Sequence, residues 1–96
     1  MIQSFGNELA RDLFEDKQTK ATRRFPGELR RAARRKLAYL HDAAELNDLN
    51  VPPGNRLEKL KRDYSGFHSI RINDQWRVVF KWTSGNAYEV SIVDYH

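Results

Sequence analysis

The sequence predicts an α+β fold, in which a short N-terminal strand and two helices pack on a C-terminal antiparallel sheet of about four strands. Before Gly54, apolar residues recur every three or four positions, which is the period of an amphipathic helix. After Gly54 they recur at every second position in short runs separated by turn residues, which indicates an antiparallel meander. Helices in this arrangement can cover one face of the sheet, and we expect one domain, residues 1–96.

The N-terminal half contains the predicted helices. Residues 2–5 are typical of an opening edge strand, and Asn7 can cap a helix that fades in the polar stretch 15–20. We expect that stretch to be a mobile loop, because it has no apolar side chain to bury. A longer helix is predicted from Pro26 to about Ala44. Its apolar stripe consists of Leu29, Ala33, Leu37, Leu40 and Ala44.

The C-terminal half is predicted to form the sheet. After a proline-containing connection at 48–54, a short strand is expected over 56–60. Three further strands are indicated by the alternating runs 68–72, 76–82 and 88–92. One face of this sheet is apolar, and the other carries Arg71, Arg77, Lys81, Ser91 and, in phase with Arg77, Tyr95. The polar face is either an ordinary solvated face, which periodicity alone favours, or the floor of a polar cleft.

Positive charge is concentrated in one stretch of the chain. The formal net charge is +4, whereas segment 17–36 alone has nine basic residues and a single acidic one, a local net charge of +8. Such a segment indicates binding to a polyanion, although a solvated helix face explains it equally well. The candidate RNA- or ribosome-binding residues of this segment are Lys17, Lys20, Arg23, Arg24, Arg30, Arg31, Arg34 and Arg35.

Several classes of function are excluded by what the sequence lacks. There is no cysteine, glycine-rich phosphate loop, dinucleotide fingerprint or zinc-binding helix motif, so we expect no cofactor and no metal. No apolar run reaches the roughly 20 residues of a membrane span, and the N-terminus has no apolar signal core, so we expect a cytoplasmic protein without membrane contact. The remaining chemistry is proton transfer and charge stabilisation, which suits RNA because its 2′-hydroxyl is itself the nucleophile.

Three sets of residues could carry that chemistry. The first is the chain end, Asp94, Tyr95 and His96, whose carboxylate, phenol and imidazole can transfer protons and stack on a base, although chain ends are usually frayed and without function. The second set precedes the meander and consists of Lys59, Lys61 and Arg62. These cations either contact phosphate or protect an edge strand against aggregation.

The third set is Arg77, with Arg71 nearby. The planar fork of an arginine that is fixed on a strand suits bidentate binding of phosphate. The alternative is a cross-strand ion pair of Arg77 with Glu89 or Asp74.

A combination of two motifs is specific: Ser-Ile-Arg-Ile-Asn-Asp-Gln-Trp-Arg at 69–77 and Val-Asp-Tyr-His at 93–96. With these motifs the chain resembles the HigB-like branch of the RelE-type toxins of type II toxin–antitoxin systems, so the expected fold is RelE-like. The likeness extends over nearly the whole chain through Met-Ile-Gln-Ser-Phe at 1–5, Ala-Ala-Glu-Leu-Asn-Asp-Leu at 43–49, Pro-Pro-Gly-Asn-Arg-Leu at 52–57, Leu-Lys at 60–61 and Gly-Phe-His at 66–68.

The resemblance implies a ribosome-dependent endoribonuclease that cuts messenger RNA. By this likeness Lys61 and Arg77 bind and stabilise the scissile phosphate, and Tyr95 orients or stacks on the RNA. Asp94 and His96 handle the protons. Some relatives have a histidine in place of Glu58, so the general base is left open and slower cleavage is implied.

The resemblance also implies the partners of the protein. They are a helix-turn-helix antitoxin of the HigA type, the ribosome and messenger RNA, with DNA bound only through the complex with the antitoxin. Two other functions remain open from the residues alone. One is a basic module that blocks the ribosome without cutting RNA, and the other is a subunit that acts only through its protein partner.

Overall fold

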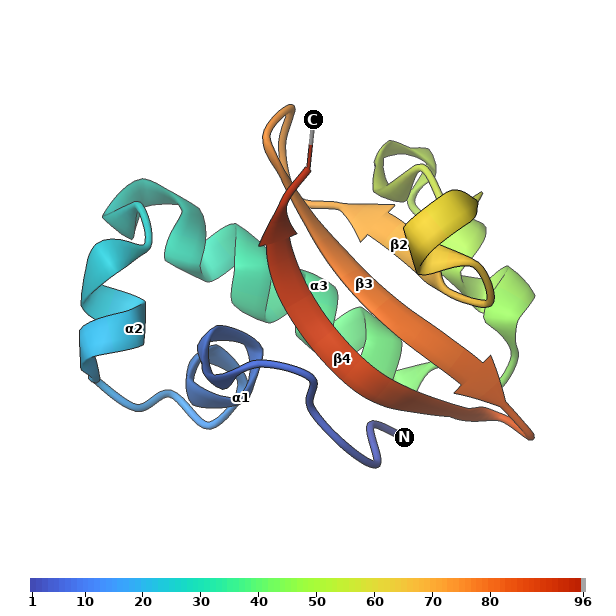
Figure 1. Ribbon diagram of the computed structural model, residues 1–96, viewed down its shortest axis with the longest axis horizontal. Helices are drawn as coiled ribbons and strands as arrows, with labels where there is room; N and C mark the ends of the chain where they lie inside the picture. The colour runs from blue at the N-terminus through green and yellow to red at the C-terminus, as the bar shows by residue number, and fades with distance from the viewer. Residues whose placement is uncertain (96) are drawn as a thin grey trace.

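Helices cover one face of a four-stranded antiparallel sheet in the computed structural model, which describes residues 1–95 (Figure 1). The strands lie in the spatial order β1-β2-β3-β4, and each is antiparallel to its neighbour. Their bounds are β1 Glu58–Lys59, β2 His68–Arg71, β3 Trp76–Thr83 and β4 Asn86–Asp94. The predicted α+β class is therefore confirmed.

The helical part contains one helix more than the sequence predicts. The helices are α1 Glu8–Phe14, α2 Lys20–Arg24 and α3 Arg30–Asp42, and short 3₁₀ turns cover Gly27–Leu29 (η1), Leu46–Asn50 (η2), Pro53–Asn55 (η3) and Arg62–Tyr64 (η4). Asn7 caps α1, since its Oδ1 accepts from the N–H of Ala10 at 3.0 Å. The unpredicted α2 begins with a capping box between Thr19 and Thr22. Within residues 1–95 none of the helices has both the length and the apolar character that crossing a membrane requires.

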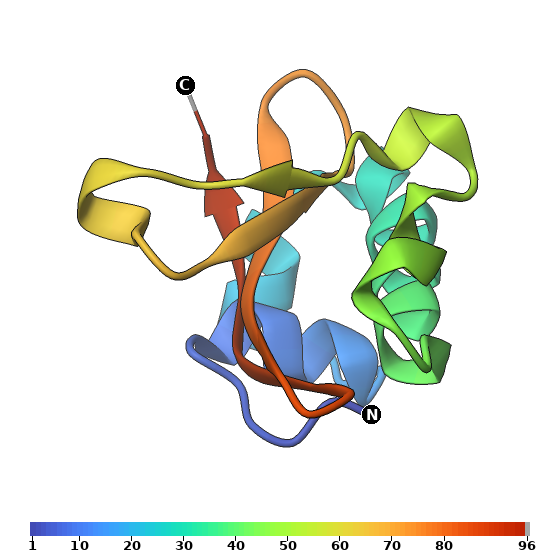
Figure 2. The same cartoon turned by 90° about the vertical axis from the view of Figure 1, so that its right-hand side faces the viewer.

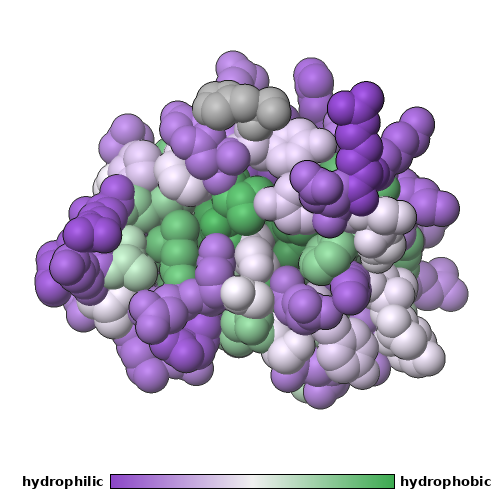
Figure 3. All heavy atoms as spheres, viewed as in Figure 1, coloured by the Kyte–Doolittle hydropathy of each residue, from purple (hydrophilic) through white to green (hydrophobic). Residues whose placement is uncertain are grey.

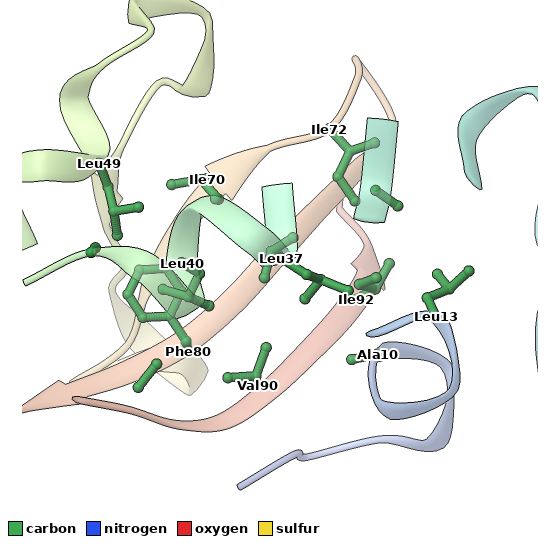
Figure 4. Packing of buried hydrophobic residues seen from close by; sticks show 14 of the residues in the cluster. Ala10, Leu13, Leu37, Leu40, Leu49, Ile70, Ile72, Phe80, Val90 and Ile92 are labelled. Atoms are coloured by element: carbon green, nitrogen blue, oxygen red, sulfur yellow. The ribbon is translucent and has the colours of Figure 1, made fainter. Parts of the chain in front are cut away.

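The hydrophobic core lies between α3, α1 and the covered face of the sheet (Figure 4). The helix α3 supplies Leu37 and Leu40, and the central strand β3 supplies Phe80, all of them fully buried. The helix ends at Asp42, so the predicted end at Ala44 is two residues too long, and Ala43 takes the buried position in place of Ala44. Of the rest of the predicted stripe, Ala33, Leu37 and Leu40 are buried in α3, whereas Leu29 precedes the helix in η1 and is half-buried.

The edge of the sheet next to β4 differs from the predicted alternation. Residues 2–5 run parallel to β4 and contact it through two isolated bridges, Ile2 to Ala87 and Phe5 to Val90, instead of forming a regular strand. A bulge at Glu89, whose φ is 52°, shifts the register of β4. Simple alternation in the predicted strand 88–92 puts Tyr88 on the same face as Val90, but the bulge changes this: Ala87 is fully buried, and Tyr88 is 36% exposed.

The second face of the sheet is partly covered by the segment that connects β1 to β2. Figure 2 shows this segment, which includes η4, on the side of the sheet opposite α3. Leu60 of the segment and Val79 of β3 are buried, although neither belongs to the main core. The polar face predicted from periodicity is thus not uniformly solvated, and its covered part contains the candidate site.

Candidate active site

Arg77 is the fixed centre of the candidate site. Its side chain leaves β3 on the face opposite α3 and is only 8% exposed. The Nε–H donates to Ser69 Oγ at 2.7 Å, and Nη2 donates to the carbonyl of Arg56 at 2.6 Å. Ser69 belongs to the neighbouring strand β2, where it pairs with Val79. Two hydrogen bonds to different elements therefore hold the plane of the guanidinium in one orientation.

The Arg56 carbonyl that accepts from Arg77 belongs to an unusual backbone conformation. Arg56 directly follows η3 and has φ 46° and ψ 60°, which is the left-handed region. Few residues other than glycine adopt this region, and those that do are usually held there by surrounding contacts. The turn η3 ends at Arg56, and this conformation directs the Arg56 carbonyl toward Nη2 of Arg77, from which it accepts a hydrogen bond.

Aromatic rings lie on the other side of the guanidinium. The Tyr95 ring centroid is 5.9 Å from Arg77 Cζ, within the range of a cation–π contact. The Tyr95 backbone N–H donates to the carbonyl of Gln75 at 2.7 Å, which continues the pairing of the sheet beyond β4. The Tyr64 ring centroid from η4 is 6.5 Å from that of Tyr95, and Tyr64 is 38% exposed. The site therefore combines a fixed cation with two rings on which a base can stack.

Burial of Arg77 and the nearby carboxylate of Glu58 have opposite effects on the pKa of Arg77. Burial lowers the pKa of Arg77, and the carboxylate of Glu58 acts in the opposite direction, with its Oε1 3.9 Å from Nη1. An arginine side chain nevertheless stays protonated in proteins. Two of its five N–H groups are used by Ser69 and Arg56, so three can face an anion. Glu58 is exposed and can move aside when an anion binds.

The acidic partners expected for Arg77 are bound elsewhere. Asp74 pairs with Arg71, and that contact, first as a hydrogen bond and then as an ion pair, lowers the pKa of Asp74. Glu89 Oε2 lies 3.1 Å from Lys81 Nζ. The proposed alternative of a cross-strand pair between Arg77 and either carboxylate is therefore wrong, and the carboxylate near Arg77 is that of Glu58.

The remaining predicted catalytic residues are Lys61, Asp94 and His96. Lys61 is exposed and directly precedes η4. Asp94 pairs with Trp76 in the sheet, and its Oδ2 accepts from Gln75 Nε2 at 2.9 Å. His96 lies outside the described residues. The structure thus unites Arg77 with Tyr95, and the roles of Lys61, Asp94 and His96 stay predictions.

Comparison with known proteins places the chain in a family. A family model described as the RelE-like toxin of the type II toxin–antitoxin system HigB matches residues 3–96. The chain belongs to this family of HigB-like toxins. Toxin HigB-1 of Vibrio cholerae is 38% identical over 87 residues, which are 91% of this chain and 90% of that protein. Endoribonuclease HigB of Proteus vulgaris is 31% identical over 96 residues, which is the full length of both chains.

Solved structures show the same fold at lower sequence identity. The YoeB–YefM complex from Staphylococcus aureus contains a chain that superposes with a TM-score of 0.60 at 18% identity, covering 100% of this chain and 98% of that chain. A heterotetrameric YoeB–YefM complex from the same organism gives a TM-score of 0.55 at 17% identity, with the same coverage of both chains. The RelE-like fold expected from the sequence is thereby confirmed for this HigB-like toxin.

The basic segment of the HigB-like toxin is only partly available to a ligand. Arg30 is half-buried, and its Nη2 donates to the carbonyl of Thr22 at 2.8 Å. Arg34 is exposed and donates to the carbonyl of Leu13 at 3.1 Å. Lys36 is buried, so it does not contribute to the exposed positive charge of segment 17–36. The predicted contacts that are exposed are Lys17, Lys20, Arg23, Arg24, Arg31, Arg34, Arg35, Lys59 and Arg62.

Figure 3 shows how hydrophilic and apolar side chains are distributed on one face of the molecule. Strongly hydrophilic side chains gather over α2 at one end of the view, and others lie at the opposite end and along the upper rim. Among residues 1–95 there is no group of three or more histidine, cysteine or carboxylate side chains placed to hold a metal ion.

Sequence reasoning missed three contributors to the site. Ser69 was visible as a polar residue in phase with Arg71 on the polar face, and the alternation could have identified it. Tyr64 gave no periodic signal, because it lies in a 3₁₀ turn. The Arg56 carbonyl carries no side-chain signal at all, since it is placed by the backbone conformation that follows η3.

Proposed function

We propose that this HigB-like toxin is an endoribonuclease that cleaves messenger RNA on the ribosome. The name of the Proteus vulgaris relative, Endoribonuclease HigB, supports the class of reaction. The observation that carries the proposal is the geometry of Arg77, a buried cation that two hydrogen bonds orient and that still has N–H groups for a phosphate. Tyr95 beside it offers a ring to the adjoining base.

The proposed reaction needs no metal and no protein nucleophile. The 2′-hydroxyl of the RNA attacks the neighbouring phosphorus, the bond to the 5′-oxygen breaks, and a 2′,3′-cyclic phosphate and a 5′-hydroxyl end result. Arg77 and Lys61 would stabilise the negative charge that develops on the phosphoryl oxygens. One group must accept the proton of the 2′-hydroxyl and another must protonate the leaving oxygen. Asp94, His96 and Glu58 are the candidates, and their order stays open.

The ribosome would hold the messenger RNA in position, which the toxin does not do by itself. Within residues 1–95 the structure contains no enclosed pocket that could hold a substrate. A nuclease without a substrate pocket requires another macromolecule to hold the RNA in reactive geometry. A messenger bound in the ribosome meets that requirement. The exposed cations of α2 and α3, including Arg23, Arg31 and Arg35, would contact phosphates of ribosomal RNA and thereby orient the toxin.

The proposed protein partner is a helix-turn-helix antitoxin encoded with the toxin. Membership in a family of type II toxin–antitoxin systems supports an antitoxin of some kind. We expect the toxin itself not to bind DNA sequence-specifically and to reach the operator only as part of that complex. Copurification of the two chains, followed by operator binding with and without the antitoxin, tests this expectation.

Translation-coupled cleavage of a defined messenger tests the enzymatic proposal. We expect wild type to produce fragments with 2′,3′-cyclic phosphate ends. Arg77→Ala should cut roughly 10²-fold more slowly or worse, which is the usual effect of removing a group that stabilises transition-state charge. The matched control is Arg11→Ala, which removes an exposed arginine of α1 and should cut like wild type.

Two results would contradict the proposal in different ways. Equal cleavage by wild type and Arg77→Ala would show that the site is wrong, although the protein is a nuclease. Arrested translation with an intact messenger would show instead that the toxin blocks the ribosome through its basic surface without cutting.

A further inference from the structure

A buried lysine and a buried asparagine lie behind the candidate active site and have no role in the reaction proposed above. Lys36 of α3 is 8% exposed, and Asn55 at the end of η3 is fully buried. Lys36 Nζ donates a short hydrogen bond to Asn55 Oδ1. Asn55 Nδ2 donates to the carbonyls of Leu49 at 3.2 Å and Val51 at 3.4 Å. One amide group therefore binds α3 to both of the turns that precede β1.

The contact between Lys36 and Asn55 is connected to the guanidinium of Arg77 through the next residue of the chain, Arg56. Asn55 is followed by Arg56, whose left-handed conformation ends η3 and whose carbonyl accepts from Arg77 Nη2 at 2.6 Å. The Asn55 N–H donates to the carbonyl of Pro52 at 3.0 Å, so its backbone and its side chain are both held. A continuous chain of contacts thus runs from Lys36 through Asn55 and one peptide unit to Arg77.

The chemistry of Lys36 argues against a role in stability alone. Burial lowers the pKa of Lys36, and the nearby charges of Arg35 and Arg71 lower it further. Its hydrogen-bond partner is a neutral amide, and its other favourable contact is the ring of Tyr39, 5.5 Å away. Burying an ammonium group without a carboxylate partner costs free energy that an apolar side chain of the same length would not cost.

We propose that Lys36 is a positioning residue for RNA cleavage: through Asn55 it fixes the Arg56 carbonyl that orients the guanidinium of Arg77. This inference rests on the proposed nuclease function and deepens it, because it assigns an origin to the rigidity of the site. Lys36 does not touch the substrate. Its effect is exerted on the direction of the remaining N–H groups of Arg77.

The kinetic test compares Lys36→Met with a variant of α3 that damages only the core. Lys36→Met keeps the length of the side chain and removes Nζ, whereas Leu40→Ala, one turn further along α3, removes buried apolar atoms and no polar group. Both are measured as single-turnover cleavage at saturating ribosomes, with the rate expressed per folded molecule. We expect Lys36→Met to lower the maximal rate about 10- to 100-fold, as a small misplacement of a catalytic group does. The half-saturating ribosome concentration should not change, and Leu40→Ala should cut like wild type.

A double-mutant comparison shows whether the effect passes through Arg77. In the Arg77→Ala background, adding Lys36→Met should cause no further loss, because the group that it positions is already absent. Equal fold losses in both backgrounds would overturn the proposal, and so would wild-type cleavage by Lys36→Met alone.

A measurement without RNA separates this inference from the nuclease proposal. In ¹⁵N-labelled protein the Nε–H of Arg77, assigned by its disappearance in Arg77→Lys, should exchange slowly with water because it is buried against Ser69. Lys36→Met should accelerate that exchange at least several-fold. Leu40→Ala, measured under conditions in which both variants have the same free energy of unfolding, should not. Unchanged exchange in Lys36→Met would overturn the positioning role even in an active nuclease. Faster exchange in Lys36→Met, together with a wild-type protein that cuts no RNA, would support the positioning of Arg77 by Lys36 and reject the nuclease function.

Discussion

The two faces of the sheet use adjacent residues of the same strands for different purposes. On the face under α3, Ile70 and Val78 are fully buried in the apolar core. On the opposite face their chain neighbours Ser69 and Arg77 are also buried, and they form a hydrogen bond with each other. The period of two in a strand separates the two sets completely. One face holds the strands in place, and the other uses that rigidity to orient a cation.

Burial alone therefore does not show which residues contribute to stability. The apolar face gains free energy from the area that it removes from water. The polar face loses free energy by burying a guanidinium and recovers it only through specific partners. Damage to the first face should therefore lower stability, and damage to the second should chiefly lower the rate of the reaction.

The largest expected effect is on the apolar face. Ile70→Ala removes a fully buried side chain from the middle of β2 and should lower the free energy of unfolding by about 2–5 kcal/mol. The cleavage rate per folded molecule should stay at the wild-type value. Denaturant unfolding and single-turnover cleavage check the two quantities. A lower rate in molecules that are shown to be folded would mean that the two faces are not independent.

The matched change on the other face is one residue away. Ser69→Ala removes the acceptor of Arg77 Nε–H, and hydrogen bonds to charged groups contribute about 1.5–3 kcal/mol. We expect a cleavage rate lowered by about tenfold and a loss of stability smaller than that of Ile70→Ala. The same two measurements apply. The comparison of the faces breaks down if Ser69→Ala costs more stability than Ile70→Ala and leaves the rate unchanged.

The division between the faces could largely be predicted from the sequence. Strict alternation from Trp76 to Trp82 places Arg77 opposite the core residues, and the phase of the last strand places Tyr95 on the same face. These are short-range consequences of strand geometry. The side-chain contact between Arg77 and Ser69 also follows once the register of β2 against β3 is known.

Other features depend on contacts that no local pattern records. The helix α2 has no apolar stripe, and a contact between Thr19 and the buried Asp12 ties its start to α1. The bulge at Glu89 reverses the expected orientation of Tyr88 through one backbone conformation. Lys36 lies in a run of exposed cations, and only the return of η3 to α3 shows that it is buried.

Tyr64 tests how far the active face extends beyond the fixed guanidinium. Its ring contacts the rings of Tyr95 and Phe67, and it is the more exposed part of this aromatic group. Stacking of a base on an aromatic ring contributes about 1–3 kcal/mol. Tyr64→Ala should therefore raise the half-saturating messenger concentration roughly tenfold, and Tyr64→Phe should behave like wild type. If Tyr64→Phe is as defective as Tyr64→Ala, the hydroxyl rather than the ring is responsible.

The smallest expected effect is a pH dependence that acts on the apolar face alone. His68 precedes Ser69 in β2 and stacks on Phe80, with ring centroids 6.2 Å apart. Its Nδ1 is buried and makes no hydrogen bond within residues 1–95. Burial, and then the charge of Lys59, lower the pKa of His68. The folded protein therefore favours the neutral imidazole more strongly than the unfolded chain does.

The sign of the effect follows from linkage between proton binding and folding. Since the folded pKa is below the unfolded value of about 6.5, the unfolded chain binds more protons as the pH falls through that region. Neutral His68 thus contributes its full stability above pH of about 6.5 and loses it at lower pH. Unfolding of wild type and His68→Phe at pH 7.5 and pH 5 should show a smaller loss of stability in the variant, because the two proteins differ only in this imidazole. A loss of the same size in both proteins would mean that His68 does not link the apolar face to pH.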